Sequence, residues 1–188
     1  MKKGTGKLRQ DNNQKVLQYF INYKEATKKE IADFYHLSVM TVGTILNTFL
    51  KEQIIYEKEM MFQKKGRPTQ KYSLHPHYYH LLLLYIMEKD NQYEIFCQVK
   101  DALSQLVKEK RLIQEKLNLD KVIKEIKKII NRDSYIQYIG IGIPASVSED
   151  KIIESDIQEL KNSPDKSILE SQLGVKISIF NDMKYSAY

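Results

Sequence analysis

The sequence is poor in the residues that mark secreted or membrane-spanning proteins. Its 188 residues include one cysteine and no tryptophan. A lone Cys97 has no partner for an intramolecular disulfide, which is typical of a reducing compartment. The longest apolar run, Leu81–Met87, is far shorter than the about 20 residues of a spanning helix. The basic start Met1–Lys3 is followed by no apolar core, so we expect no export signal, no membrane partner and a cytoplasmic protein.

Hydrophobic residues make up 42% of the chain and charged residues 29%, which excludes global disorder. The charge is unevenly distributed. Residues 1–75 hold fourteen Lys or Arg against seven Asp or Glu, whereas residues 76–188 hold sixteen against seventeen. A positive excess confined to the first part of the chain indicates an anionic partner there, although a solvated basic surface is the simpler alternative.

The pattern of elements changes near Pro76, a residue that can neither continue a helix nor pair in a central strand. Before it, the sequence predicts three helices followed by a hairpin. After it, strands alternate with helices. We therefore expect two domains, residues 1–75 and residues 76–188, and a mixed α+β and α/β fold.

Three helices are predicted in the first domain. The first covers about Asn13–Tyr23, with Val16, Leu17, Phe20 and Ile21 on one face. The second begins after Thr27, which forms a capping box with Glu30, and its residues Ile31, Phe34 and Tyr35 recur at helical spacing. The third is capped by Ser38, runs to about Glu52, and is expected to bury Val42, Ile45, Leu46 and Phe49.

The opposite face of the third helix carries small or hydrogen-bonding side chains. Met40, Thr41, Thr44 and Asn47 could contact base edges and thymine methyl groups in a major groove. Two helices joined by a short turn form the helix-turn-helix geometry, whose second helix enters that groove. A three-helix bundle with a polar outer face is the alternative.

The segment after the third helix favours DNA binding. Residues 54–57 and 71–74 are predicted strands, and a hairpin that follows a helix-turn-helix forms a wing. Its tip is cationic, and an arginine there can enter a narrow minor groove. Charged residues that only prevent edge pairing are the alternative. The expected wing contacts are Lys64, Lys65, Gly66, Arg67 and Pro68. Lys28 and Lys29, which open the second helix, are expected to hold phosphates.

Together these motifs resemble the winged-helix domain of ROK family repressors. The matching residues there are Leu8–Arg9, Asn12, Lys29–Ala32, Leu37–Ser38, Thr41–Val42, Ile54–Ile55 and Gly66–Pro68. The second half continues the resemblance, to the sugar-kinase-like domain of that family, at Tyr138–Ser146, Ile153–Ser155, Leu173–Val175 and Phe180–Asp182. The resemblance implies a winged helix-turn-helix followed by a partial actin-like (ribonuclease-H-like) α/β lobe.

The departures from the family bear on catalysis. In its kinases a glycine-rich turn between the first two strands holds ATP phosphates. Here the turn Glu88–Gln92 has no glycine, and Glu88 and Asp90 would repel phosphate unless Lys89 balances them. The family's catalytic base maps onto Asp182, but the chain ends at Tyr188, before a second lobe could close the sugar cleft. We therefore expect no catalytic residue, no cofactor and no kinase activity.

Other candidate sites have simpler interpretations. His75, His77 and His80 lie close in sequence, but they lack convergent thiolate or carboxylate ligands, so no metal is expected. Cys97 is expected in the core rather than as a nucleophile. The lysines of the amphipathic segment 121–132 favour a solvated face over a second DNA site.

The sequence thus predicts a sequence-specific DNA-binding transcriptional regulator, a repressor of sugar-related genes by the resemblance. Its partners would be double-stranded DNA and a second copy of the chain, since specific binding uses two half-sites. A sugar or sugar-phosphate effector is a further candidate, against which the absence of the second lobe argues. Two alternatives stay open. One is a kinase remnant that binds carbohydrate without catalysis through Pro144, Asn181 and Asp182. The other is a module whose winged helix binds a protein.

Overall fold

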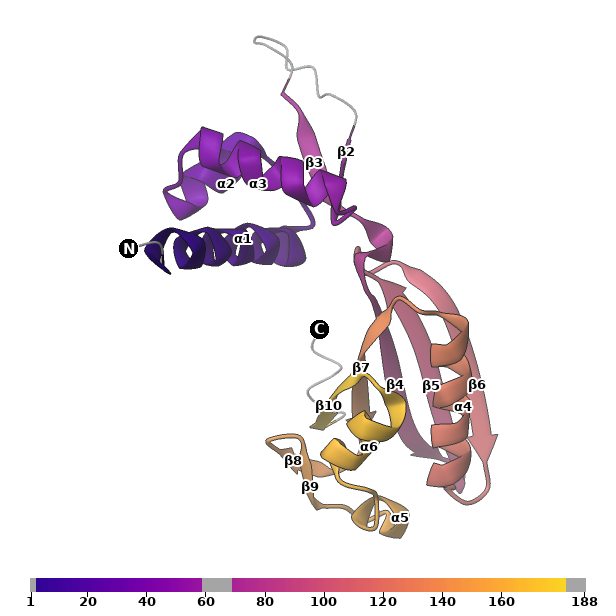
Figure 1. The fold of residues 1–188 in the computed structure, drawn as a ribbon. Coiled ribbons are helices and arrows are strands. Elements are labelled where there is room, and N and C mark those ends of the chain that lie inside the picture. The colour runs from indigo at the N-terminus through magenta and orange to yellow at the C-terminus, as the bar shows by residue number, and fades with distance from the viewer. Residues whose placement is uncertain (1–2, 59–68, 182–188) are drawn as a thin grey trace. The chain divides into compact units, whose positions relative to one another are not determined.

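The computed structural model describes residues 3–58 and 69–181 of the chain. These residues belong to two compact units, Met1–Tyr78 and Tyr79–Tyr188, which are described separately below (Figure 1). Within the described residues, no helix is both long enough and apolar enough to cross a membrane.

The first unit combines three helices with a small antiparallel sheet. Its elements are α1 (Lys3–Tyr23), β1 (Glu25–Thr27), α2 (Lys28–Tyr35), α3 (Val39–Lys51), β2 (Ile55–Glu57), β3 (Lys71–Leu74) and the short 3₁₀ turn η1 (Pro76–Tyr78). The strands lie in the order β1-β3-β2. The predicted capping box is confirmed, because the Thr27 N–H donates to Glu30 Oε2 at 2.6 Å and the Glu30 N–H donates to Thr27 Oγ1 at 3.2 Å.

One sequence expectation for this unit is wrong. The first helix begins at Lys3 rather than near Asn13. Residues 3–12 contain one apolar residue, Leu8, which is itself exposed, so no hydrophobic stripe marks this part of the helix. Phe34, one of the apolar residues that recur along α2, is 52% exposed. Its ring lies edge-on to Tyr19, with centroids 5.2 Å apart, and so packs within a surface cluster of aromatic rings.

The core of the first unit draws on all three helices and the sheet. Phe20 of α1, Ile31 of α2 and Leu46 of α3 are fully buried. Burial of each such side chain contributes about 1.5–3 kcal/mol. The predicted inward stripe of the third helix is confirmed, because Val42, Ile45, Leu46 and Phe49 are all buried.

The second unit is built on a five-stranded mixed sheet. Its elements are β4 (His80–Lys89), β5 (Gln92–Asp101), β6 (Leu106–Gln114), α4 (Leu119–Arg132), β7 (Ile136–Ile143), β8 (Ser146–Ser148), β9 (Lys151–Glu154), α5 (Gln158–Lys161), α6 (Lys166–Leu173) and β10 (Lys176–Asn181). The order is β10-β7-β4-β5-β6. β10, β7 and β4 are parallel, whereas β5 and β6 are antiparallel to their neighbours. This confirms the expected mixed α/β architecture.

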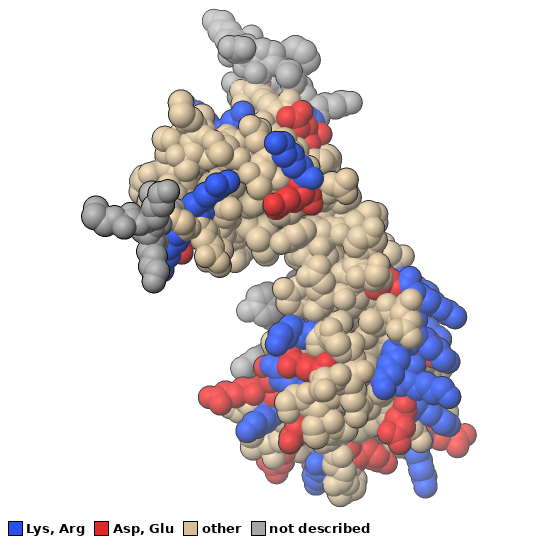
Figure 2. Space-filling view, viewed as in Figure 1, with Lys and Arg blue, Asp and Glu red and all other residues tan. Residues whose placement is uncertain are grey.

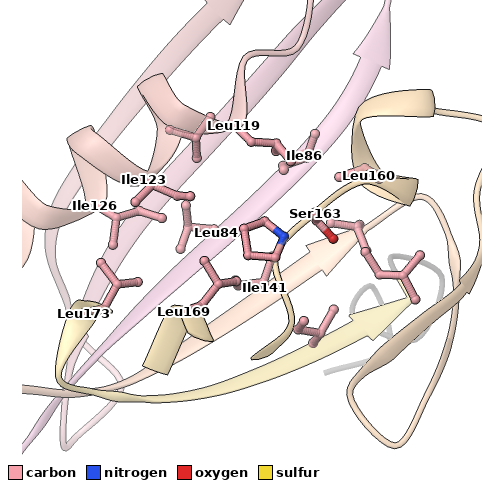
Figure 3. A pocket seen from close by; sticks show the side chains of 15 residues that line it. Leu84, Ile86, Leu119, Ile123, Ile126, Ile141, Leu160, Ser163, Leu169 and Leu173 are labelled. Atoms are coloured by element: carbon pink, nitrogen blue, oxygen red, sulfur yellow. The ribbon is translucent and has the colours of Figure 1, made fainter. Parts of the chain in front are cut away.

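One face of this sheet is covered by helices. α4 begins at the N-cap Asn118, whose side chain accepts the Lys121 N–H at 2.9 Å. It turns Val122 and Ile126 into the core. Between α4, α6 and the sheet lies a small hollow of about 70 Å³ with an almost wholly apolar lining (Figure 3). A hollow of this size and lining belongs to the core rather than to a polar ligand site.

The β4–β5 connection is tighter than the sequence indicates. The strands extend to Lys89 and from Gln92, so the turn consists of Asp90 and Asn91 alone. Both residues have positive φ, 52° and 59°, the conformation of a type I′ turn that Asn and Asp tolerate. This two-residue turn lacks the run of free backbone N–H groups that a phosphate-binding loop needs.

Candidate nucleic-acid interface

The connection between α2 and α3 is short and closed by local hydrogen bonds. His36 ends α2 in the left-handed conformation with φ 53°. Two residues later, Ser38 caps α3, and its Oγ accepts the Thr41 N–H at 3.0 Å. This satisfies one of the free N–H groups at the start of α3. The result is a pair of helices joined by a short, capped turn.

The outer face of α3 carries the residues that the sequence singles out for base contacts. Met40 is 83% exposed, and Thr44 and Asn47 are exposed as well. The Thr44 hydroxyl donates to the Met40 carbonyl at 3.1 Å, which leaves its lone pairs available as acceptors. Among the described residues, the Asn47 amide makes no hydrogen bond. The structure thus brings three polar or flexible side chains together on one accessible face.

Thr41 differs from its three neighbours on this face. It is half-buried, and its hydroxyl lies 2.8 Å from the Ser38 hydroxyl. Its side chain therefore takes part in the cap of α3.

The two lysines that open α2 have different surroundings. Lys29 is exposed. Lys28 is half-buried, and its Nζ lies 5.9 Å from the centre of the Tyr72 ring. A Cβ placed on Gly43 would lie 3.9 Å from both Cδ and Nζ of Lys28. The Lys28 side chain therefore packs between α3 and β3, whereas Lys29 is available to solvent.

Sequence reasoning missed a hollow beside α3 that has both polar and apolar side chains in its lining. This hollow, of about 430 Å³, is lined by Leu8, Arg9, Asn12, Thr41, Thr44 and Ile45. Arg9 is exposed and forms no ion pair with the described residues. The missed signal is the Leu8–Arg9 and Asn12 motif, which the late predicted start of the first helix placed outside any helix. α1 in fact carries these residues alongside α3.

The expected wing contacts Lys64, Lys65, Gly66, Arg67 and Pro68 lie outside the described residues. They belong to the segment that joins β2 to β3, and these strands pair antiparallel from Ile55 opposite Leu74 to Glu57 opposite Tyr72.

The residues expected for carbohydrate binding lie in the second unit. Pro144 follows β7, and Asn181 ends β10 opposite Ile143. Both therefore lie at the carboxyl ends of parallel strands, where open α/β sheets commonly bind ligands. The Asn181 amide donates to the Ala145 carbonyl at 2.7 Å and thereby links the two strand ends. Asp182 lies outside the described residues.

The histidines do not converge. His80 is buried, and its Nδ1 lies 2.6 Å from Asp133 Oδ2, so it links the start of β4 to the end of α4. His75 accepts the His77 N–H at 3.2 Å through Nδ1. In the described part of the chain, no three His, Cys, Asp or Glu side chains lie close enough together to hold a metal ion.

Comparison with known proteins gives matches at the level of structure. No protein-family model matches the sequence, and no curated protein matches it. Among the solved structures, 24 chains match. One of them is a Listeria monocytogenes protein described as a candidate N-acetylmannosamine kinase. It has a TM-score of 0.46 and 18% identity, and the match covers 55% of this chain and 35% of that chain.

Another match is a ROK family transcriptional regulator, a homologue of the E. coli Mlc protein. It has a TM-score of 0.62 and 14% identity, and the match covers 96% of this chain. The same match covers 47% of the other chain, so the present chain spans about half the length of that regulator. Over nearly all of its residues, the chain shares the fold of the matching part of that ROK family regulator.

Proposed function

We propose that the chain is a sequence-specific DNA-binding transcriptional regulator whose first unit is a winged helix-turn-helix. The observation that carries this proposal is the outer face of α3, where Met40, Thr44 and Asn47 are exposed on a helix whose other face is fully packed. The fold shared with a ROK family regulator supports the same function.

In this proposal α3 lies in the major groove of duplex DNA. The Asn47 amide can donate to and accept from an adenine edge, and Thr44 can accept from a base. Met40, near the helix start, contacts a thymine methyl group. Thr41, at the cap of α3, lies close to the DNA backbone. The N-terminal turn of α3, capped by Ser38, faces a phosphate.

Phosphate contacts would position the helix. Lys29 holds a phosphate from the start of α2, and Arg9 holds another from α1. Lys28 acts mainly by supporting α3, because its side chain packs against Gly43 and Tyr72. Lys64, Lys65 and Arg67 would contact the backbone and the flanking minor groove from the segment between β2 and β3.

The resemblance to sugar-linked repressors extends the proposal to a cytoplasmic repressor of sugar-related genes. It would act as a homodimer, because a helix-turn-helix commonly reads two half-sites. We further propose that it has no kinase activity. The two-residue Asp90–Asn91 turn supports this, since it offers neither glycine nor a phosphate-binding loop.

The deciding experiment is selection of bound sequences from random duplexes, followed by titration of the selected site. Asn47→Ala should reduce the preference for one base position by about 1–3 kcal/mol while leaving binding to unrelated DNA unchanged. The matched control is Asn162→Ala, an exposed asparagine of the second unit. Equal affinity of the unmodified chain for selected and scrambled duplexes would contradict base readout.

A carbohydrate site is a second candidate function, which the position of Pro144 and Asn181 at adjacent parallel strand ends favours. Calorimetry against simple sugars and sugar phosphates tests it, and no heat across the panel would contradict it. The protein-binding alternative predicts little salt dependence of DNA binding, whereas neutralisation of several phosphates makes affinity fall steeply with salt.

A further inference from the structure

The charges of the second unit are segregated. Residues 105–132 hold nine Lys or Arg against four Asp or Glu, whereas the rest of residues 79–188 holds seven against thirteen. A net charge of +5 on one strand and one helix therefore contrasts with −6 on the remainder. Such segregation creates a local positive potential that the balanced net charge of the unit conceals.

The structure gathers this charge on one surface, which we call the α4 basic face: Lys108 and Lys110 of β6 with Lys121, Lys124, Lys127, Lys128 and Arg132 of α4. Figure 2 shows Lys and Arg side chains grouped over these two elements. Glu125 joins the two elements, because it pairs with Lys110 and with Lys128, the latter at 3.2 Å.

Most of the cations on α4 have no acidic partner. Lys121, Lys124, Lys127 and Arg132 are exposed and form no ion pair with the described residues. Lys121, Lys124, Lys128 and Arg132 recur at the three- and four-residue spacing that places side chains along one side of a helix. At 1.5 Å per residue, they span about 16 Å.

The surroundings of these cations narrow the class of partner. The apolar side of α4, with Val122, Ile126 and Ile129, is buried in the core, so the helix has nothing to insert into a lipid surface. The outer side of α4 presents no exposed large hydrophobic residue, although β6 exposes Leu106, Val107 and Ile113. The helix itself therefore lacks the apolar anchors on which protein interfaces depend. A row of cations without anchors suits a regular polyanion, and about 16 Å of duplex carries roughly nine phosphates.

We propose that the α4 basic face is a second, sequence-independent contact for the phosphate backbone of duplex DNA. This inference rests on the proposed function for one point, which is that the polyanion bound by the chain is DNA. From the sequence alone, a solvated helix face is the favoured interpretation of these lysines. The structure adds the neighbouring β6 cations, the missing acidic partners and the absence of apolar anchors on the outer side of α4.

The test of this second DNA contact is the rate at which each lysine of the full chain is acetylated at low salt, with and without a random-sequence duplex. We expect DNA to slow the acetylation of Lys121, Lys124 and Lys127 at least threefold, and to leave Lys151 and Lys161, exposed lysines elsewhere in the unit, unchanged. Equal rates for both groups would overturn the inference. Equal protection by polyglutamate at matched charge would also overturn it, because any acidic chain would then suffice.

The same experiment separates this inference from the proposed function. Protection of Lys29 without protection of the α4 lysines would leave the regulator proposal standing and overturn the second contact. Protection of the α4 lysines without Lys29 would support the second contact and count against the proposed interface in the first unit.

A charge-neutralising variant gives an independent readout. Replacement of Lys121, Lys124 and Lys127 by Gln should lower the slope of log affinity against log salt by up to about 2.7 on a random duplex. Preference for the selected site over the random duplex should stay the same or rise. The control replaces Lys89, Lys151 and Lys161 by Gln, an equal change in net charge, and should retain the slope. Equal slopes for the two variants would overturn the inference.

Discussion

The hydroxyl oxygens of Ser38 and Thr41 lie 2.8 Å apart at the first turn of α3. The Thr41 N–H also donates to Ser38 Oγ at 3.0 Å, so the two residues form a closed cap. The start of α3 is therefore fixed by its own side chains. A helix whose first turn is held in this way can present Met40 and Thr44 in one orientation before any partner binds.

Ser38→Ala should lower the free energy of unfolding of the first unit by about 1 kcal/mol, because an orphan N–H of α3 loses its acceptor. Denaturation followed by circular dichroism measures this. The control is Thr48→Ala later in the same helix, whose hydroxyl donates to the Thr44 carbonyl at 3.2 Å. The free energy of unfolding should fall by less than about 0.5 kcal/mol in this control, since the Thr44 carbonyl can keep its backbone hydrogen bond within the helix. Equal losses would contradict a special role for the cap.

Arg9→Ala should weaken DNA binding at every sequence and lower the salt slope by about 0.9, the effect of one lost phosphate contact. Fluorescence anisotropy over a series of salt concentrations measures both quantities. Lys15→Ala removes an equal charge from an exposed position of α1 that does not line the hollow. If both variants behave alike, the Arg9 effect is one of net charge rather than of position.

Glu25 of β1 pairs with Lys58, which follows β2, and with Lys71 of β3. These pairs make the stability of the first unit depend on pH. Hydrogen bonds from Lys58, at 2.7 Å, and from Lys71 hold the pKa of the Glu25 carboxyl below its ordinary value. A lowered pKa means that this stabilisation is present above about pH 4.5 and is lost as the pH falls through the folded-state pKa.

Glu25→Gln should therefore lower Tm by roughly 2 °C at pH 7, a modest effect because the group is partly exposed. The difference should disappear below the folded-state pKa, as measured by thermal denaturation at a series of pH values. A difference that is constant down to pH 2 would mean that the ionised carboxylate is not its source.

Cys97 should be unreactive in the folded chain. It is 2% exposed, and burial raises the pKa of its thiol to about 11, so little thiolate is present at pH 8. Ellman's reagent should label Cys97 only after denaturant is added. Labelling should begin at the denaturant concentration at which the second unit unfolds. Rapid labelling in native buffer would contradict its place in the core of the second unit.

Elements with a local signal could be predicted from the sequence, and elements held by distant contacts could not. The Thr27 capping box and the buried stripe of α3 follow from spacing alone and are confirmed. β1 has three residues and depends on pairing with β3, more than forty residues away, so no local pattern marks it. β6 was also missed, because its exposed, charged residues lack the apolar alternation of a strand.

For the candidate site, the sequence indicates which residues have side chains suited to contact DNA. The structure adds whether each side chain is exposed or packed against its neighbours. Exposure of Met40, Thr44 and Asn47 agrees with their helical spacing. Spacing could not reveal that Lys28 is packed against a neighbouring helix and strand, because that contact depends on how α2, α3 and β3 meet.

The packing of Lys28 limits how this scaffold could be re-engineered. Its side chain passes close to Gly43 and ends beside the Tyr72 ring. An alanine at position 43 would make an ordinary contact, whereas a longer side chain would push the lysine off the ring. A helix grafted in place of α3 to test the proposed DNA contacts should therefore carry glycine or alanine at this position, or be grafted together with a compatible second helix.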